Sequence, residues 1–128
     1  MILALLLTAV ISAPPKLDVA SDARQLACYQ RASNQQGRNS CVRDAYNRAE
    51  KRMREEWALL FGIIKAEDAK HLNTSQEAWL AYRAAWCRAV AWDQRGQADW
   101  AQWHFGCLAA LTRQRTKEID DLIVGDGY

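Results

Sequence analysis

Four cysteines carry the most obvious chemistry of this chain: Cys28, Cys41, Cys87 and Cys107. An even number of cysteines in a small exported domain is typical of disulfide bonds. Zinc binding is the rival use, but no two cysteines form a C-x-x-C pair, and only His104 with Cys107 combines the two ligand types at close spacing. The missing pair also argues against a thioredoxin-like redox centre. We therefore expect two disulfides, no metal site and no cofactor.

Catalysis would need nucleophiles, bases and acids at compatible positions, and the other titratable residues do not supply them. Neither His71 nor His104 has a serine or an acid placed by sequence to complete a catalytic triad. The paired acids at 55–56 and 120–121 are adjacent, so on a helix they point to different sides and are unsuited to sharing a proton. The sequence therefore favours a protein that is not an enzyme.

The composition is that of one folded domain. The chain has 128 residues, of which 50% are hydrophobic, and this excludes a disordered protein. The formal net charge is only +2, and no long block of like charges marks a tail that binds nucleic acid. Nucleic acid is therefore not an expected partner.

Residues Met1–Ala13 form an apolar run that is typical of a signal peptide and too short to span a bilayer. Two prolines follow Ala13 and would hinder cleavage there, so we place the cleavage site after Ala23. On this interpretation residues 1–23 are the leader and residues 24–128 are the domain. The expected location is the periplasm or the exterior, with no transmembrane span after processing.

A first long helix is predicted from Val42 to Ile64, because apolar residues recur there at intervals of three and four. The polar segment at 33–37 before it is predicted to be a loop, which Cys28 and Cys41 could anchor.

A second helix is predicted to begin at Thr74, because Thr74 and Glu77 match the S/T-x-x-E capping box. It should end near residues 92–93, and Gly96 then supplies a turn. Asp99 can cap a third helix that continues to about residue 122. The expected fold is all-α, a small three-helix antiparallel bundle or a helical hairpin with disulfides.

The second helix carries an aromatic stripe of Trp79, Tyr82 and Trp86, with Cys87 at its edge. Such stripes usually pack against neighbouring helices, so we expect this one in the core. Arg83 lies beside the stripe and is expected to be a partly buried hydrogen-bond donor. The chain has six tryptophans, which is many for a small core, so an exposed aromatic cluster would mark an interface.

Three disulfide pairings are possible for four cysteines. If the chain reverses at Gly96, Cys87 and Cys107 lie at similar distances from the turn and can join the two helices. Cys28 and Cys41 would then close the N-terminal loop. Hairpin geometry therefore favours this pairing over the other two.

Together these residues resemble the LprI-like lysozyme-inhibitor family of bacterial envelope proteins. The resemblance rests on the four cysteines, on S-Q-E-A-W-L-A-Y-R-A-A-W-C at 75–87 and on C-L-A-A-L-T-R-Q-R at 107–115. It implies a set of family-motif residues: Gln76, Trp79, Tyr82, Arg83, Thr112 and Arg115. One departure is Ala84, which stands where the family has an acid. The partner of Arg83 is therefore expected to be Glu77, Asp93 or a backbone carbonyl.

The resemblance implies a protein that binds and inhibits lysozyme. A lysozyme cleft holds two catalytic carboxylates, so Arg95 in the polar turn at 94–97 is the candidate for partner contact. The alternative for this segment is a plain turn between helices. The alternative function is a non-catalytic envelope interaction module that binds peptidoglycan or a protein partner.

Charge argues mildly against lysozyme as the partner. Loss of the leader leaves a small excess of basic residues, which would repel a basic lysozyme at long range. An acidic patch of Asp120, Asp121 and Asp126 could offset this repulsion, although a solvated tail is the simpler interpretation.

Overall fold

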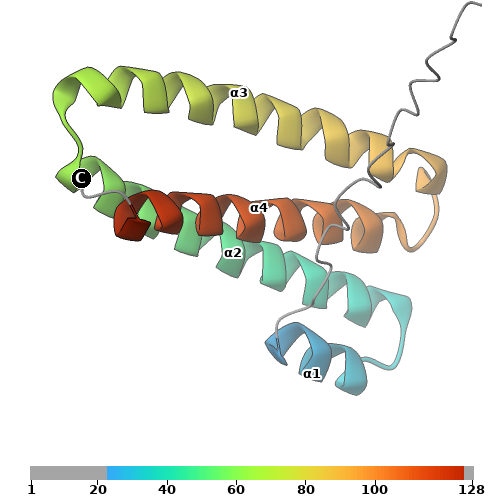
Figure 1. Ribbon diagram of the computed structural model, residues 1–128. Coiled ribbons are helices and arrows are strands. Elements are labelled where there is room, and N and C mark those ends of the chain that lie inside the picture. The colour runs from blue at the N-terminus through green and yellow to red at the C-terminus, as the bar shows by residue number, and fades with distance from the viewer. Residues whose placement is uncertain (1–22, 126–128) are drawn as a thin grey trace, which may run out of the picture.

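The computed structural model describes residues 23–125, which form helices and connecting turns (Figure 1). The elements in chain order are α1 (Ala23–Arg31), α2 (Gln35–Ile63), α3 (Ala66–Val90), the 3-10 helix η1 (Trp92–Gln94) and α4 (Trp100–Gly125). The all-α prediction is confirmed. The expected count of three helices is not matched, because α1 adds a fourth. Residues 1–22 of the predicted leader lie outside the described residues, as does Asp126 of the suggested acidic patch.

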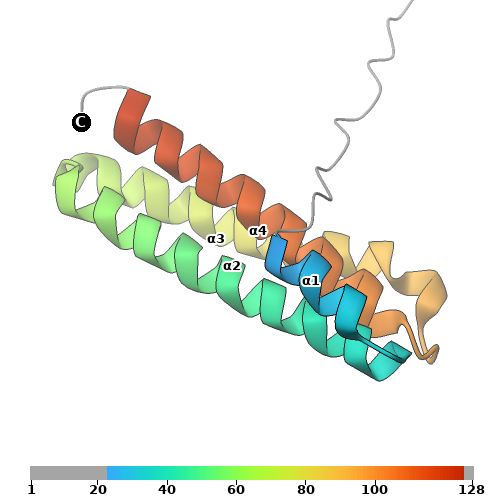
Figure 2. The same cartoon turned by 90° about the horizontal axis from the view of Figure 1, so that it is seen from below.

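The three long helices lie side by side with alternating directions (Figures 1 and 2). Helices α2 and α4 run parallel to each other and pack along most of their length, and α3 runs antiparallel to both. Helix α1 packs on α2, on the side away from α3. Consecutive long helices are therefore antiparallel, as predicted, and the closest helix pair is α2 with α4.

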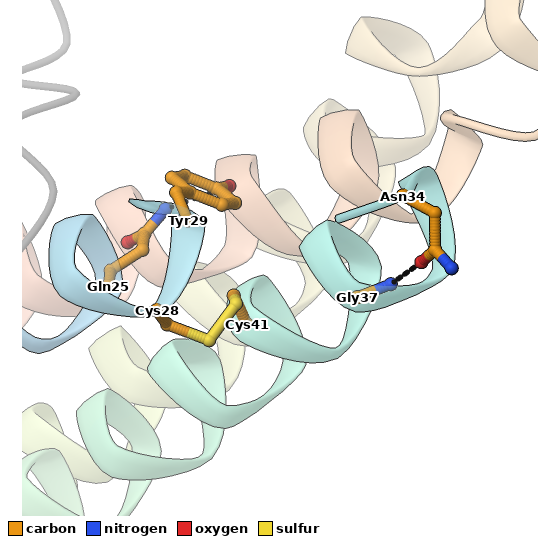
Figure 3. Close-up of a disulfide and its surroundings, with 6 residues drawn as sticks. All are labelled: Gln25, Cys28, Tyr29, Asn34, Gly37 and Cys41. Carbon is orange, nitrogen blue, oxygen red and sulfur yellow. Dashed lines mark hydrogen bonds between the residues drawn. A yellow bond between two sulfur atoms is a disulfide. The ribbon is translucent and has the colours of Figure 1, made fainter. Parts of the chain in front are cut away.

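The predicted loop at 33–37 is confirmed only at its start, because residues 32–34 are not helical but α2 already begins at Gln35. Asn34 is the N-cap, and its side-chain oxygen accepts a hydrogen bond of 2.8 Å from the backbone N–H of Gly37 (Figure 3). A Cβ at position 37 would lie 3.2 Å from the Cβ of Ala32, so glycine allows the close approach of the chain between α1 and α2. The polar segment thus forms the end of a short connection and the capped first turn of α2.

The predicted start of the second helix at Thr74 is wrong. Helix α3 begins at Ala66, after a connection in which Lys65 has extended backbone. Glu67 and Asp68 lie in the first turn, where negative charge favours the positive end of the helix dipole. The Thr74 hydroxyl donates 3.0 Å to the carbonyl of Lys70, one turn back within the helix. The connection between α2 and α3 contains neither glycine nor proline, and therefore gave no signal in the sequence.

The connection between α3 and α4 contains the predicted glycine turn. Gly96 has φ +74°, a conformation that glycine adopts without strain. The side chain of Asn39 donates 2.8 Å to the carbonyl of Ala98, and Gln35 donates 2.9 Å to the side chain of Gln102. The first turns of α2 therefore hold this connection in place.

Two clusters of buried apolar residues fill the bundle. The first consists of Cys87, Cys107, Leu108 and Leu111, and the second consists of Met53, Leu60 and Ile119. Trp79 packs against both clusters. This tryptophan therefore joins the two halves of the core.

Both disulfides lie toward one end of the bundle. Cys28 pairs with Cys41 and Cys87 with Cys107, with Cα–Cα distances of 5.7 and 5.5 Å. This is the pairing that hairpin geometry favours. The same end holds the connections between α1 and α2 and between α3 and α4 (Figure 1). We call it the bridged end.

Removal of the second bridge by Cys87→Ala with Cys107→Ala is expected to lower the free energy of unfolding by about 3 kcal/mol, because the unfolded chain gains freedom. Urea unfolding of the oxidised protein measures this change. An unchanged unfolding midpoint would show that the bridge does not constrain the fold.

Candidate functional site

Arg83 joins all three long helices. It is 8% exposed, and its Nη1 donates to Glu50 Oε2 of α2 at 2.6 Å and to Thr112 Oγ1 of α4 at 2.9 Å. The expected partners Glu77, Asp93 and a backbone carbonyl are therefore wrong. The acid comes from a different helix, 33 residues away in sequence.

Two aromatic rings and a second hydrogen bond complete the surroundings of this ion pair. The guanidinium carbon of Arg83 lies 4.9 Å from the ring centroid of Trp79 and 5.6 Å from that of Tyr46. The Thr112 hydroxyl donates 2.6 Å to the carbonyl of Leu108, so it accepts from Arg83 with a fixed orientation. The charge is thus buried with an acid, a hydroxyl and two π faces around it.

Arg115 forms a second set of contacts between α4 and α3. Its Nε donates 3.0 Å to the Gln76 side chain and its Nη2 donates 3.1 Å to the Ser75 hydroxyl. Its guanidinium carbon lies 5.6 Å from the ring centroid of Trp79, which also contacts Arg83. Its Nη1 donates 2.9 Å to Glu118 within α4. Five of the motif residues therefore form one network that positions α3: Gln76, Trp79, Arg83, Thr112 and Arg115.

The position of Glu50 in the sequence is itself a signal of its buried partner. Glu50 lies on the same helical stripe as Tyr46, Met53 and Trp57, because the intervals are three and four residues. An acid on an apolar stripe is expensive to bury unless it is paired. Its position therefore indicates a buried cation on a neighbouring helix.

The prediction that the whole aromatic stripe is core is wrong for two of its members. Trp79 is partly buried, but Tyr82 is 52% and Trp86 is 42% exposed. Helix α3 packs through a narrow seam of Trp79, Arg83 and Cys87, so the side chains on its flank face solvent. The rings of Tyr82 and Trp86 stack, with centroids 6.3 Å apart and an interplanar angle of 14°.

Two more exposed aromatic residues lie close in sequence to the cysteines of the Cys87–Cys107 disulfide. Trp92 follows α3 and is 56% exposed, and Trp103 in the first turn of α4 is 51% exposed. Each lies four or five residues from Cys87 or Cys107. We call Tyr82, Trp86, Trp92 and Trp103 the aromatic surface. Exposed aromatics of this number are the expected mark of an interface.

Arg95 lies in the turn beside this surface. Its guanidinium carbon is 3.3 Å from the ring centroid of Trp92, and its Nε donates 3.0 Å to the carbonyl of Trp92. The side chain is exposed, so the stacked guanidinium keeps donors available to a partner. The structure therefore places the predicted contact residue against one exposed tryptophan, Trp92.

A comparison with known protein families gives this arrangement its context. Residues 27–119 match the family model described as "Lysozyme inhibitor LprI". The chain belongs to the LprI family. A relative from Rhizobium meliloti (strain 1021), called uncharacterized protein R02472, is 27% identical over 106 residues, which cover 73% of this chain and 76% of the relative. No solved structure matches the chain significantly.

Residues 23–125 contain no candidate for a membrane-spanning helix or for a metal site. None of the helices in this part of the chain is long and apolar enough to cross a membrane. No group of three or more histidine, cysteine, aspartate or glutamate side chains within these residues is arranged to hold a metal ion.

The ion pair between Arg83 and Glu50 predicts a large loss of stability on mutation. Arg83→Met should lower the free energy of unfolding by about 3 kcal/mol, because it leaves the largely buried carboxylate of Glu50 with only the longer contact of 3.4 Å to the exposed Arg54. Adding Glu50→Gln should recover part of the loss, and urea unfolding of the single and double variants measures this coupling.

A matched control is Lys51→Met, which removes the exposed pair with Glu55 and should change stability by less than about 1 kcal/mol. If Arg83→Met cost no more than this control, Arg83 would not be the residue that joins the helices.

His104 predicts a dependence of stability on pH. Its ring stacks on Trp100 with centroids 4.5 Å apart, and burial, with the nearby Arg88 as a smaller cause, lowers the pKa of His104 below its usual 6.5. The unfolded chain therefore binds a proton more readily, and the free energy of unfolding should fall as the pH drops from 6.5 toward the lowered pKa.

Urea unfolding between about pH 7.5 and 5 measures this slope, which His104→Phe should reduce while keeping an aromatic ring on Trp100. The variant His71→Gln, at an exposed histidine, should retain the slope. Equal slopes in the wild type and His104→Phe would rule out His104 as the cause.

Proposed function

We propose that this chain is an exported envelope protein that binds lysozyme and inhibits it. The observation that carries the proposal is the match of residues 27–119 to the lysozyme-inhibitor family. Two disulfides support a location outside the cytoplasm, where such bonds persist. The leader at 1–23 and the domain at 24–128 are part of this proposal.

We assign the contact with lysozyme to the aromatic surface and Arg95. Tryptophan, tyrosine and arginine are the residue types that contribute most to the affinity of protein interfaces. All of these residues lie within eight positions of Cys87 or Cys107 in the sequence, and the bridge joins these two cysteines at the bridged end. We do not assign the contact to the Arg83 network, because the charged groups of Arg83 and Glu50 are largely buried and pair with each other.

The stacking of Arg95 on Trp92 suits a cleft with two carboxylates. A guanidinium donates in a fixed fork to carboxylate oxygens, and water exclusion strengthens such bonds. Because Trp92 already holds the side chain, little rotamer freedom remains to be lost on binding. This local attraction can outweigh a weak long-range repulsion between two basic proteins.

The turn that carries Arg95 is also held in place. Hydrogen bonds from Asn39 and Gln35 fix the start of α4 and the residues before it, and the disulfide fixes the end of α3. A preformed binding turn loses less entropy on association than a mobile one. The geometry therefore supports inhibition by occupation of the cleft or its rim.

A lysis assay tests the proposal. Protein with both disulfides formed should slow the clearing of a bacterial cell suspension by lysozyme, and the double variant Trp92→Ala with Arg95→Ala should inhibit at least about tenfold less. Arg31→Ala is the matched control, because it removes an exposed arginine from α1.

The wild type would refute inhibition if it left the lysis rate unchanged at micromolar concentration. Retention of that same protein on insoluble peptidoglycan would then favour the envelope interaction module. Equal inhibition by the double variant and the wild type would refute the assigned surface while leaving inhibition itself in place.

A further inference from the structure

The outer side of α3 lies at one edge of the bundle. This helix is on the side opposite α1, and none of the other helices in residues 23–125 lies beyond it (Figures 1 and 2). Helix α3 packs inward through Trp79, Arg83 and Cys87, so the residues between these positions point away from the bundle. On a helix at the surface of a monomer, such positions normally carry polar and charged side chains.

The outer side of α3 does not follow this pattern, whereas that of α2 does. The exposed positions of α2 from 43 to 55 are all charged except for Asn47. The exposed positions of α3 from 78 to 90 are alanine, leucine, tyrosine, tryptophan and valine, and Arg88 is the one charged residue among them. A helix that is apolar on all sides is normally covered on all sides. The composition of α3 therefore indicates a partner on its outer side.

One stripe of α3 has the spacing of a face that packs against another helix. It consists of Glu77, Leu80, Ala81, Ala84 and Arg88, at positions i, i+3, i+4, i+7 and i+11. All five residues are exposed, and Leu80 is 38% exposed. We call these residues the outer stripe. Its centre is apolar, and it has an acid at one end and a base at the other.

The two charges make the outer stripe complementary to a reversed copy of itself. Glu77 and Arg88 are about 16 Å apart along the helix axis, and neither forms an ion pair within residues 23–125. A two-fold axis midway between them would place Glu77 of each copy opposite Arg88 of the other. A parallel arrangement would instead place like charges together, which is unfavourable. The charges therefore select an antiparallel second copy as the partner.

We propose that two copies of this chain associate through their outer stripes, with the two α3 helices antiparallel. Ala81 of each copy lies close to Ala84 of the other, and these small side chains allow the helix axes to approach to about 8 Å. Leu80 supplies the larger apolar group that leaves water on association. The contact extends over only three turns of each helix, so the dimer is weak and reversible.

The dimer contact is separate from the surface assigned to lysozyme. Tyr82 and Trp86 each lie two residues from Ala84, which is about 200° around the helix. They therefore point to the opposite flank of α3 and stay exposed in the dimer.

Sedimentation equilibrium of the disulfide-bonded protein, combined with a charge swap, tests the proposal. The wild type should form dimers at about 100 μM, and added salt should weaken them. Glu77→Arg and Arg88→Glu each place like charges at both ends of the contact, so each should weaken the dimer at least about tenfold. The double variant exchanges the two charges and restores both attractive pairs, so its affinity should return close to that of the wild type.

Asp44→Arg is the matched control, because it reverses an exposed acid of α2, and it should dimerise as the wild type does. A wild type that stays monomeric up to about 1 mM would overturn the proposal. Unchanged association in both single variants would also overturn it, as would a double variant no stronger than the single ones. Glu77 and Arg88 are exposed and lie outside the aromatic surface, so their variants should fold and leave any lysozyme inhibition unchanged. The two proposals can therefore fail separately.

Discussion

The buried ion pair between Arg83 and Glu50 is the constraint on which the bundle depends. Helix α3 has few apolar side chains on its inner seam, and the guanidinium of Arg83 occupies the centre of that seam. Burying this charge is favourable only if acceptors meet it with good geometry. Glu50 and Thr112 do so from two other helices, and the pair therefore fixes the position of α3 along both. A shift of any one helix by a turn would separate the charges.

This constraint explains why the family-motif residues and the residues of the aromatic surface are largely different sets. The motif residues Gln76, Trp79, Arg83, Thr112 and Arg115 contact one another across the helices, so they maintain the scaffold. Tyr82 is the motif residue that points outward, and it stacks on Trp86. A family with a shared scaffold can change its partner by changing the flank of α3 and the turn after it. The match to the family therefore supports the fold more directly than it supports the identity of the partner.

Much of the architecture could be predicted from the sequence because helical periodicity and cysteine spacing are local signals. The glycine turn at Gly96, the all-α class and the favoured disulfide pairing are examples. The start of α3 could not be predicted from the sequence, since the capping-box pattern at Thr74 also fits the interior of a helix. The partner of Arg83 could not be found among nearby acids, because a contact between helices is set by packing. The exposure of Tyr82 and Trp86 depends equally on how narrow the packed seam of α3 is, which periodicity does not reveal.

The position of both disulfides at one end should make the two halves of the molecule unequal in mobility. Covalent bonds hold Cys28 to Cys41 and Cys87 to Cys107, whereas the other end relies on the apolar cluster of Met53, Leu60 and Ile119. Local opening requires less free energy where fewer constraints must be broken. Backbone amides of α2 near Leu60 and of α4 near Ile119 should therefore exchange their hydrogens sooner than those beside the bridges. Thermal fraying would begin at the end opposite the aromatic surface, so the protein can loosen there while that surface keeps its shape.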